Sequence, residues 1–205
     1  MIKVLVYGGK KIVEWVADFL EREIIAEVKK MIPKEDFLEL SNAGIWQETE
    51  KDLADAIGKN ELIVLADPLD AMVMGKELER RYPEQKFAWY GQGVEQMVRK
   101  CKALYILASR KIRRMDLYQR TKARCQEIKI MESEPDGWKE IIEKEEVDRG
   151  EIIEKVRTAQ GAPIFVFDSE LLFPKVRDII DWRGEMIDME KGLLLVIKDR
   201  LGLKG

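Results

Sequence analysis

The 205-residue sequence contains no histidine and only two cysteines, Cys101 and Cys125. Histidine is the usual general base near neutral pH and the most common metal ligand. Acid–base chemistry would therefore have to come from carboxylates, lysine, tyrosine or cysteine. Because the two cysteines are far apart and have no partner cysteines, the sequence predicts neither a zinc site nor a disulfide framework.

A strong charge of one sign is also missing, since 36 Lys and Arg residues face 39 Asp and Glu residues and leave a net charge of −3. We therefore expect neither nucleic acid nor a membrane surface as a partner. No apolar run approaches the roughly 20 residues that a membrane helix needs. The first residues, MIKVLVYGG, are short and strand-like, unlike a signal peptide, which predicts a cytoplasmic protein.

Asparagine is scarce as well, with only Asn42 and Asn60, whereas Lys, Glu and Arg are abundant. This composition is typical of a protein from a hot environment, in which ion pairs help and labile amides are avoided. It predicts a thermophilic source and says nothing about function.

What the sequence does contain is an alternation of short apolar runs with helical patterns. The apolar runs predict strands at residues 2–7, 37–40, 62–65, 87–90, 104–108, 128–131, 164–167 and 185–187. The helical patterns predict helices at residues 11–30, 49–57, 69–81, 94–100, 112–124, 138–145, 147–159, 173–182 and 190–201. This order predicts an α/β fold with parallel sheets covered by helices on both faces.

Ligands of such folds bind at the carboxyl ends of the strands. Two aspartates stand at predicted strand ends, Asp67 in LIVLADPLDAM and Asp168 in IFVFDSELLFP. A functional site is one interpretation of these acids. In the other, Asp67 begins a turn before Pro68, and Asp168 or Ser169 caps the following helix.

Two further strand ends carry candidate binding residues. In YGGKK, the amides of Gly8 and Gly9 with Lys10 could hold an anion, although the full G-x-G-x-x-G pattern is absent and a tight turn would also need glycine. In ASRKIRR, Ser109 offers a hydroxyl beside a basic cluster that could bind phosphate or carboxylate.

The segment from APIFVFDSELLFP to GEMIDMEKG resembles one in which a strand ends in G-C-T-H-Y-P and a later short strand ends in I-D. LIVLADPLDAMVMGKELERRYP is similar to a strand ending in A-C-N-T-A-S with its helix, and LASRKIRRMDLY to G-T-x-A-T-V-x-S-x-A-Y. These segments and their order resemble the aspartate/glutamate racemase superfamily, most of all glutamate racemase.

The resemblance implies two α/β lobes that face each other across a cleft, residues 1–100 with 181–205 and residues 101–180. It also implies a homodimer that needs no cofactor. The two family cysteines that remove and return the substrate's α-proton align with Asp67 and Asp168. Pro68 replaces an asparagine that helps hold the substrate, and Glu170 replaces the histidine beside the second cysteine.

Gly8 and Gly9 stand where the family has Asp-Ser. A carboxylate of ordinary pKa is about four and a half units less basic than a thiolate, which amounts to about 6 kcal/mol in proton abstraction. Asp67, Asp168 and Glu170 would also repel an acidic substrate. Such a cleft suits a cationic small molecule, either an amine or a divalent metal held by oxygen ligands.

Three hypotheses follow from these residues. In the favoured one, the protein is a racemase-like binding or regulatory homologue without cysteine-dependent racemase activity. In the second, it is an active racemase, isomerase or lyase that uses Asp67 and Asp168 as acid and base, with pKa values raised by burial. In the third, only the α/β architecture is shared and the acids are helix caps.

Overall fold

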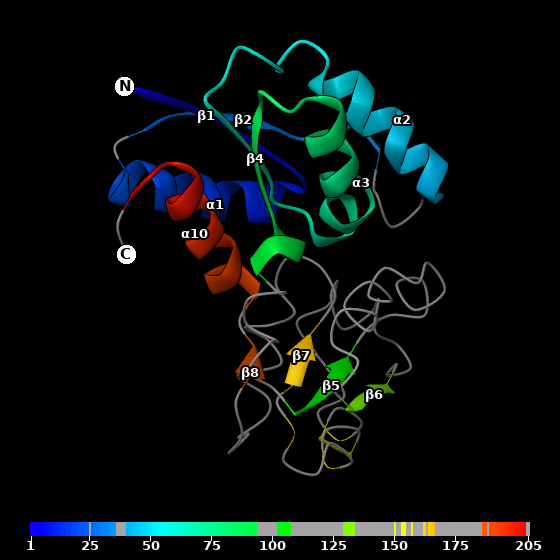
Figure 1. Cartoon of the computed structure of the whole chain (residues 1–205). Coiled ribbons are helices and arrows are strands. Elements are labelled where there is room, and N and C mark those ends of the chain that lie inside the picture. Colours follow the sequence, from blue (N-terminus) through cyan, green and yellow to red (C-terminus); the bar gives the residue numbers. More distant parts are fainter. Residues whose placement is uncertain are drawn as a thin grey trace. The chain divides into compact units, whose positions relative to one another are not determined.

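Two parallel sheets form the framework of the computed structural model (Figure 1). The structure describes residues 1–24, 26–35, 40–93, 102–107, 129–133, 150, 153–154, 157, 162, 164–166, 186–187 and 189–203. The chain divides into one unit made of Met1–Val94 with Glu190–Gly205 and a second unit made of Glu95–Met189. The predicted α/β class with parallel sheets is confirmed.

The sheet of the first unit has the strand order β2-β1-β3-β4. Its strands are β1 (Ile2–Tyr7), β2 (Ala26–Met31), β3 (Leu62–Leu65) and β4 (Lys86–Trp89). The parallel register places Met31, Tyr7, Leu65 and Trp89 in one row across the sheet. The carboxyl ends of all four strands therefore lie along the same edge.

The helices of this unit with described bounds are α1 (Lys10–Glu23), α2 (Asn42–Leu53), α3 (Pro68–Arg81) and α10 (Met189–Arg200), which leads back into it. Figure 1 shows α2 beside α3 on one side of β4, with α1 and α10 on the other side. Buried apolar side chains of β1 and β3 fill the space between these layers, as expected for strands covered on both faces.

The helix α10 returns to the first unit from the far end of the sequence. Its residues Leu193, Val196 and Ile197 are buried. The approach is close, because a Cβ built on Gly93 would lie 2.5 Å from the carbonyl carbon of Gly192. At the other end of α10, the guanidinium of Arg200 donates to Oε1 of Glu79 at 2.7 Å.

Two of the predicted helices in this unit were wrong in extent. The helix predicted at residues 11–30 ends at Glu23, and β2 (Ala26–Met31) takes its place. The helix predicted at residues 49–57 runs instead over Asn42–Leu53, because the hydroxyl of Ser41 accepts from the Gly44 N–H at 3.2 Å and caps an earlier start. Residues 37–39 of the predicted strand 37–40 lie outside the described residues.

The sheet of the second unit has the strand order β6-β5-β7-β8 and is also parallel. Its strands are β5 (Ala103–Leu107), β6 (Lys129–Ser133), β7 (Ile164–Val166) and β8 (Met186–Ile187). Because β8 pairs with β7, it belongs to this unit, although residues 181–205 were predicted to belong to the first. The helices predicted at 94–100, 112–124, 138–145 and 173–182, and most of 147–159, lie outside the described residues.

Within the part of the chain that the structure describes, no helix is both long enough and apolar enough to cross a membrane.

Candidate functional site

The carboxyl edge of the first sheet brings Gly8 and Asp67 together. Gly8 follows β1, and its N–H donates to the carbonyl oxygen of Met31 on β2 at 3.3 Å. Its φ of +148° is rarely adopted by residues with a side chain, and a Cβ there would lie 2.7 Å from the backbone nitrogen of Asp67. Gly8 is therefore required by a close approach of two strand ends.

Asp67 is buried, with 7% of its surface exposed, and lies between β3 and α3. Its Oδ1 accepts from the backbone N–H of Asp70 at 3.4 Å, and its carbonyl oxygen accepts from the Ala71 N–H at 2.9 Å. These contacts make Asp67 the N-cap of α3. Pro68 is the first residue of that helix, where its missing N–H leaves no helical hydrogen bond unmade.

Asp70 lies one helical turn after Asp67 and is completely buried. The hydroxyl of Thr49, on α2, donates to Oδ1 of Asp70 at 2.6 Å, whereas Oδ2 has no hydrogen-bond partner among the described residues. Burial raises the pKa of the Asp70 carboxyl well above its ordinary value, and the charges of Asp67 and Asp52 raise it further against the opposing Thr49 hydrogen bond.

Tyr7 and Asp52 complete this group of polar side chains. The phenol of Tyr7, at the end of β1, donates to Oδ2 of half-buried Asp52 at 3.1 Å. Burial raises the pKa of Tyr7 far above its ordinary value, and the charge of Asp70 adds to the effect. We call Tyr7, Thr49, Asp52, Asp67 and Asp70 the acidic cluster. It lies where β1, α2 and the first turn of α3 meet.

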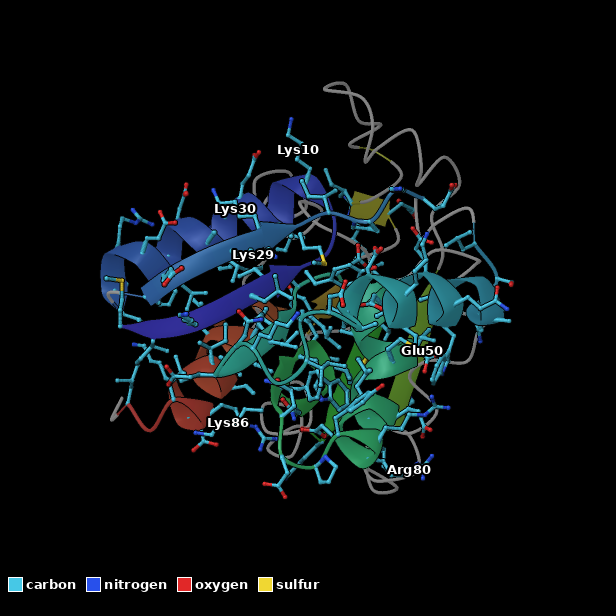
Figure 2. All side chains as sticks on the ribbon, turned by 90° about the horizontal axis from the view of Figure 1, so that it is seen from above. Lys10, Lys29, Lys30, Glu50, Arg80 and Lys86 are labelled. Atoms are coloured by element: carbon cyan, nitrogen blue, oxygen red, sulfur yellow. The ribbon has the colours of Figure 1, made fainter. Side chains whose placement is uncertain are left out.

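The other predicted site residues divide into two groups. Gly9 is the N-cap residue of α1, and Lys10, the first residue of that helix, is exposed and projects away from the ribbon (Figure 2). Ser109, Asp168, Ser169 and Glu170 lie outside the described residues. The structure therefore brings together Gly8, Asp67 and Pro68 of the predicted residues and does not describe the second aspartate.

Sequence reasoning missed Tyr7, Thr49, Asp52 and Asp70 as members of the site. Asp70 carried a readable signal, because an acid three residues after a helix cap lies in the same turn as that cap. Thr49 and Asp52 reach the cluster through the packing of α2 against α3, and Tyr7 reaches it from β1, which pairs with β3. The sequence offered no local signal for these contacts. Within the described residues, no group of three His, Cys, Asp or Glu side chains is arranged to hold a metal ion.

A separate cavity of about 640 Å³ opens at the opposite edge of the sheet. It lies between the loop that precedes β3 and the loop that precedes β4, and Gln85 ties these loops together by accepting from Gly58 N–H and donating to the Asn60 carbonyl. Its lining residues are Ile57, Gly58, Asn60, Glu61, Arg81, Tyr82, Pro83, Glu84, Gln85 and Lys86. Because ligands of parallel sheets bind at the carboxyl edge, the acidic cluster is the better candidate site.

Comparison with solved structures identifies the class of fold: the chain has the α/β fold of the aspartate/glutamate racemases. Glutamate racemase from Francisella tularensis, solved with D-glutamate, has a TM-score of 0.77 and 11% identity, and the match covers 99% of this chain and 83% of that one. An aspartate racemase homologue from Pyrococcus horikoshii has a TM-score of 0.61 and 18% identity, and the match covers 98% of this chain and 100% of that one.

A solved protein of the same fold is named for a different substrate. Allantoin racemase from Klebsiella pneumoniae has a TM-score of 0.67 and 11% identity, with coverage of 99% of this chain and 89% of that one. No model of a known protein family and no curated protein matches the sequence. At these identities the likeness establishes the fold alone, so activity must be argued from the site.

Proposed function

We propose that this protein is a racemase-like binding protein that holds a small cationic molecule, such as an amine, at the acidic cluster and does not catalyse cysteine-dependent racemisation. The observation that carries the proposal is the position of Asp67. It lies two residues after the end of β3 at the carboxyl edge, where the resemblance to glutamate racemase places a catalytic thiol, and the further acids Asp52 and Asp70 lie near it.

The charge of the cluster decides the class of ligand. The charged groups that act on buried Asp70 are Asp67 and Asp52, and both are acidic. An amino acid with two carboxylates would meet repulsion here, whereas an ammonium group would be attracted and could donate hydrogen bonds to carboxylate oxygens. An organic amine is preferred to a metal because the described acids lack a metal-binding arrangement.

The chemistry of the thiol position supports the same conclusion. With an ordinary pKa, a carboxylate in place of a thiolate weakens proton abstraction from an α-carbon by about 6 kcal/mol. This corresponds to a rate lower by roughly four orders of magnitude if the whole difference appears in the barrier. An enzyme that kept the reaction would have to recover this difference through its surroundings.

A second candidate function is favoured by the buried state of Asp70. Burial at this edge raises the pKa of a carboxyl group well above its usual range, and a carboxylate with a raised pKa is a stronger base. On this observation, an active cofactor-independent racemase, isomerase or lyase that uses Asp67 and Asp168 as acid and base is the alternative.

The resemblance also leads us to propose a homodimer, which sedimentation analysis would test.

The two functions are separated by hydrogen exchange at the substrate's α-carbon. The wild-type protein, Asp67→Asn and Asp168→Asn would each be incubated in deuterated water with a panel of D- and L-amino acids, and loss of the α-proton signal would be followed by NMR. The binding proposal predicts no exchange above the buffer rate. Exchange by the wild type that either substitution abolishes would overturn it and establish the second function.

Binding itself is tested by thermal melting with putrescine, spermidine and methylamine, and with glutamate and aspartate for comparison. A ligand present at 100 times its Kd stabilises the folded state by about 2.7 kcal/mol. We expect an amine to raise the Tm of the wild type and the acidic amino acids to leave it unchanged.

The variants assign the effect to the site. Asp67→Asn should lose the rise in Tm with amine, while Glu84→Gln should keep it. Glu84 is a suitable control because it is an exposed acid at the opposite edge of the same sheet and its substitution changes the net charge equally. An equal loss in both variants would mean that the amine responds only to overall charge.

A further inference from the structure

Asp70 occupies an unusual place for an acid in the first turn of a helix. At this position, carboxylates are normally exposed and stabilised by the helix dipole. Here the side chain is completely buried, because it turns towards α2 and meets Thr49. The side chain must therefore be held by something other than water.

Among the described residues, the groups around Asp70 come from β1, from α2 and from the residue before α3. Thr49 on α2 supplies one donated hydrogen bond, Asp52 on α2 and Asp67 before α3 supply negative charge, and Tyr7 of β1 has its phenol bonded to Asp52. None of the ion pairs among the described residues includes Asp70, and its Oδ2 has no partner among them. One hydroxyl cannot compensate a buried carboxylate in such surroundings.

We propose that Asp70 is a positioning residue for Asp67. Its backbone N–H holds the Asp67 carboxylate in place, and its own side chain remains beside that carboxylate as a neutral, protonated acid. This inference rests on the proposed role of Asp67 as the ligand-binding carboxylate. Asp67 is then the charged member of this pair of acids.

The physical basis is the separation of two neighbouring acids by their environments. Asp67 accepts a backbone hydrogen bond, which favours its charged form, whereas Asp70 is fully buried beside that charge. When two titratable groups are driven apart in this way, one stays charged while the other retains its proton. Burial and the charge of Asp67 both raise the pKa of Asp70, which agrees with the geometry.

A consequence for the ligand follows. While Asp70 is protonated, the pair suits a single ammonium group. When Asp70 loses its proton at higher pH, the added negative charge strengthens the attraction for a cation, so affinity for an amine should rise with pH through the titration of Asp70. The same proton therefore gives the site a built-in dependence on pH.

The primary test measures stability and does not depend on the ligand. Because the folded protein keeps the Asp70 proton more strongly than the unfolded chain, unfolding releases a proton in the window between the ordinary pKa of about 4 and the raised one. In that window the unfolding equilibrium constant should rise about tenfold per pH unit from this group. Asn mimics the protonated acid, so Asp70→Asn should lack this component.

Urea unfolding of the wild type and Asp70→Asn over a range of pH gives the difference curve. We expect the variant to gain stability relative to the wild type as pH rises through the window, and the gain to level off above it. A difference that is the same at every pH, or that reverses in sign, would overturn the proposal because Asp70 would then carry no extra proton.

Two further variants test the coupling. In an Asp67→Asn background, the stability difference between Asp67→Asn and Asp67→Asn/Asp70→Asn should level off at lower pH than in the wild type, because the charge of Asp67 no longer raises the pKa of Asp70. Thr49→Val, which removes the hydrogen bond that favours the charged form, should move the window to higher pH. It also provides a test if Asp70→Asn does not fold.

The outcomes separate this inference from the proposed function. An unchanged window in the Asp67→Asn background would overturn the pairing of the two acids, whatever the protein binds. If amines fail to raise the Tm of the wild type but the pH windows are as expected, the proposal of a cationic ligand is overturned and the proposal of a protonated Asp70 stands. Asp52→Asn is the matched control. It should move the upper end of the pH window downward by less than Asp67→Asn does, because Asp52 raises the pKa of Asp70 less strongly than Asp67 does.

Discussion

Gly8 and Asp67 approach so closely that a side chain on residue 8 would collide with the backbone of the acid. A built Cβ would lie 2.7 Å from the Asp67 nitrogen and 3.1 Å from its Cβ. The racemases that the sequence resembles carry Asp-Ser at this turn. In this chain the turn has no room for a side chain at residue 8, so the backbone of Asp67 can lie at its observed position only because residue 8 is glycine.

Substitution of Gly8 by alanine should therefore be costly. The φ of +148° is unfavourable for alanine, and the atom nearest to the added Cβ is the backbone nitrogen of Asp67, which cannot move aside. We expect Gly8→Ala to lower the free energy of unfolding by about 3 kcal/mol. Gly58→Ala is the control, because φ is +76° but no atom lies within 4 Å, and it should cost about 1 kcal/mol. Urea unfolding measures both; equal losses would show that backbone conformation alone decides.

The capping role of Asp67 can be separated from its proposed binding role. Asp67→Ala removes the oxygen that accepts from the Asp70 N–H and should destabilise the protein by about 1 kcal/mol, whereas Asp67→Asn keeps an acceptor and should cost much less. Ser41→Ala at the start of α2 provides a matched cap deletion. Chemical denaturation would measure all three, and a loss in Asp67→Asn as large as in Asp67→Ala would exclude capping as the cause.

Trp89 occupies space that only glycine at position 75 leaves open. A Cβ on Gly75 of α3 would overlap the indole ring, which is 8% exposed at the end of β4. Gly75→Ala should therefore destabilise the protein by about 2 kcal/mol by overpacking. In a Trp89→Leu background the same change should cost at least 1 kcal/mol less. Additive effects in this double-mutant cycle would rule out the contact as the source of the loss.

Tyr7 should stay protonated at pH values at which exposed tyrosines ionise. Its pKa is raised far above the ordinary value of about 10 by burial and by the charge of Asp70. Alkaline titration followed by tyrosinate absorbance should therefore give the same amplitude for the folded wild type and for Tyr7→Phe, although the wild type has five tyrosines. A smaller amplitude in folded Tyr7→Phe would show that Tyr7 titrates in the native state.

The sequence predicted the interior of the first sheet well and its edge poorly. β1 and β3 are continuous apolar runs because both of their faces are covered, and both were predicted with the observed bounds. β2 is an edge strand whose residues include Glu27, Lys29 and Lys30, and its Val28 fitted the three- and four-residue spacing of the preceding helix. Pairing with β1, a non-local interaction, decides its structure.

The site was predictable to a similar extent. Asp67 could be placed at the end of a strand because the apolar run before it is unmistakable. That Asp70 is buried, and that Thr49 is its neighbour, depends on α2 packing beside α3. The helical pattern of residues 49–57 gave the wrong extent for α2, so no reasoning from that pattern could have aligned Thr49 with Asp70.

The return of α10 to the first unit has a consequence for the order of events during synthesis. Strands β1 to β4 leave the ribosome first, but their surroundings include Leu193, Val196 and Ile197, which are translated only after the whole second unit. Since domains tend to fold as they emerge, the nascent first unit must wait with an open apolar face. The second unit can therefore complete its fold before the first unit does, although the strands of the first unit are translated earlier.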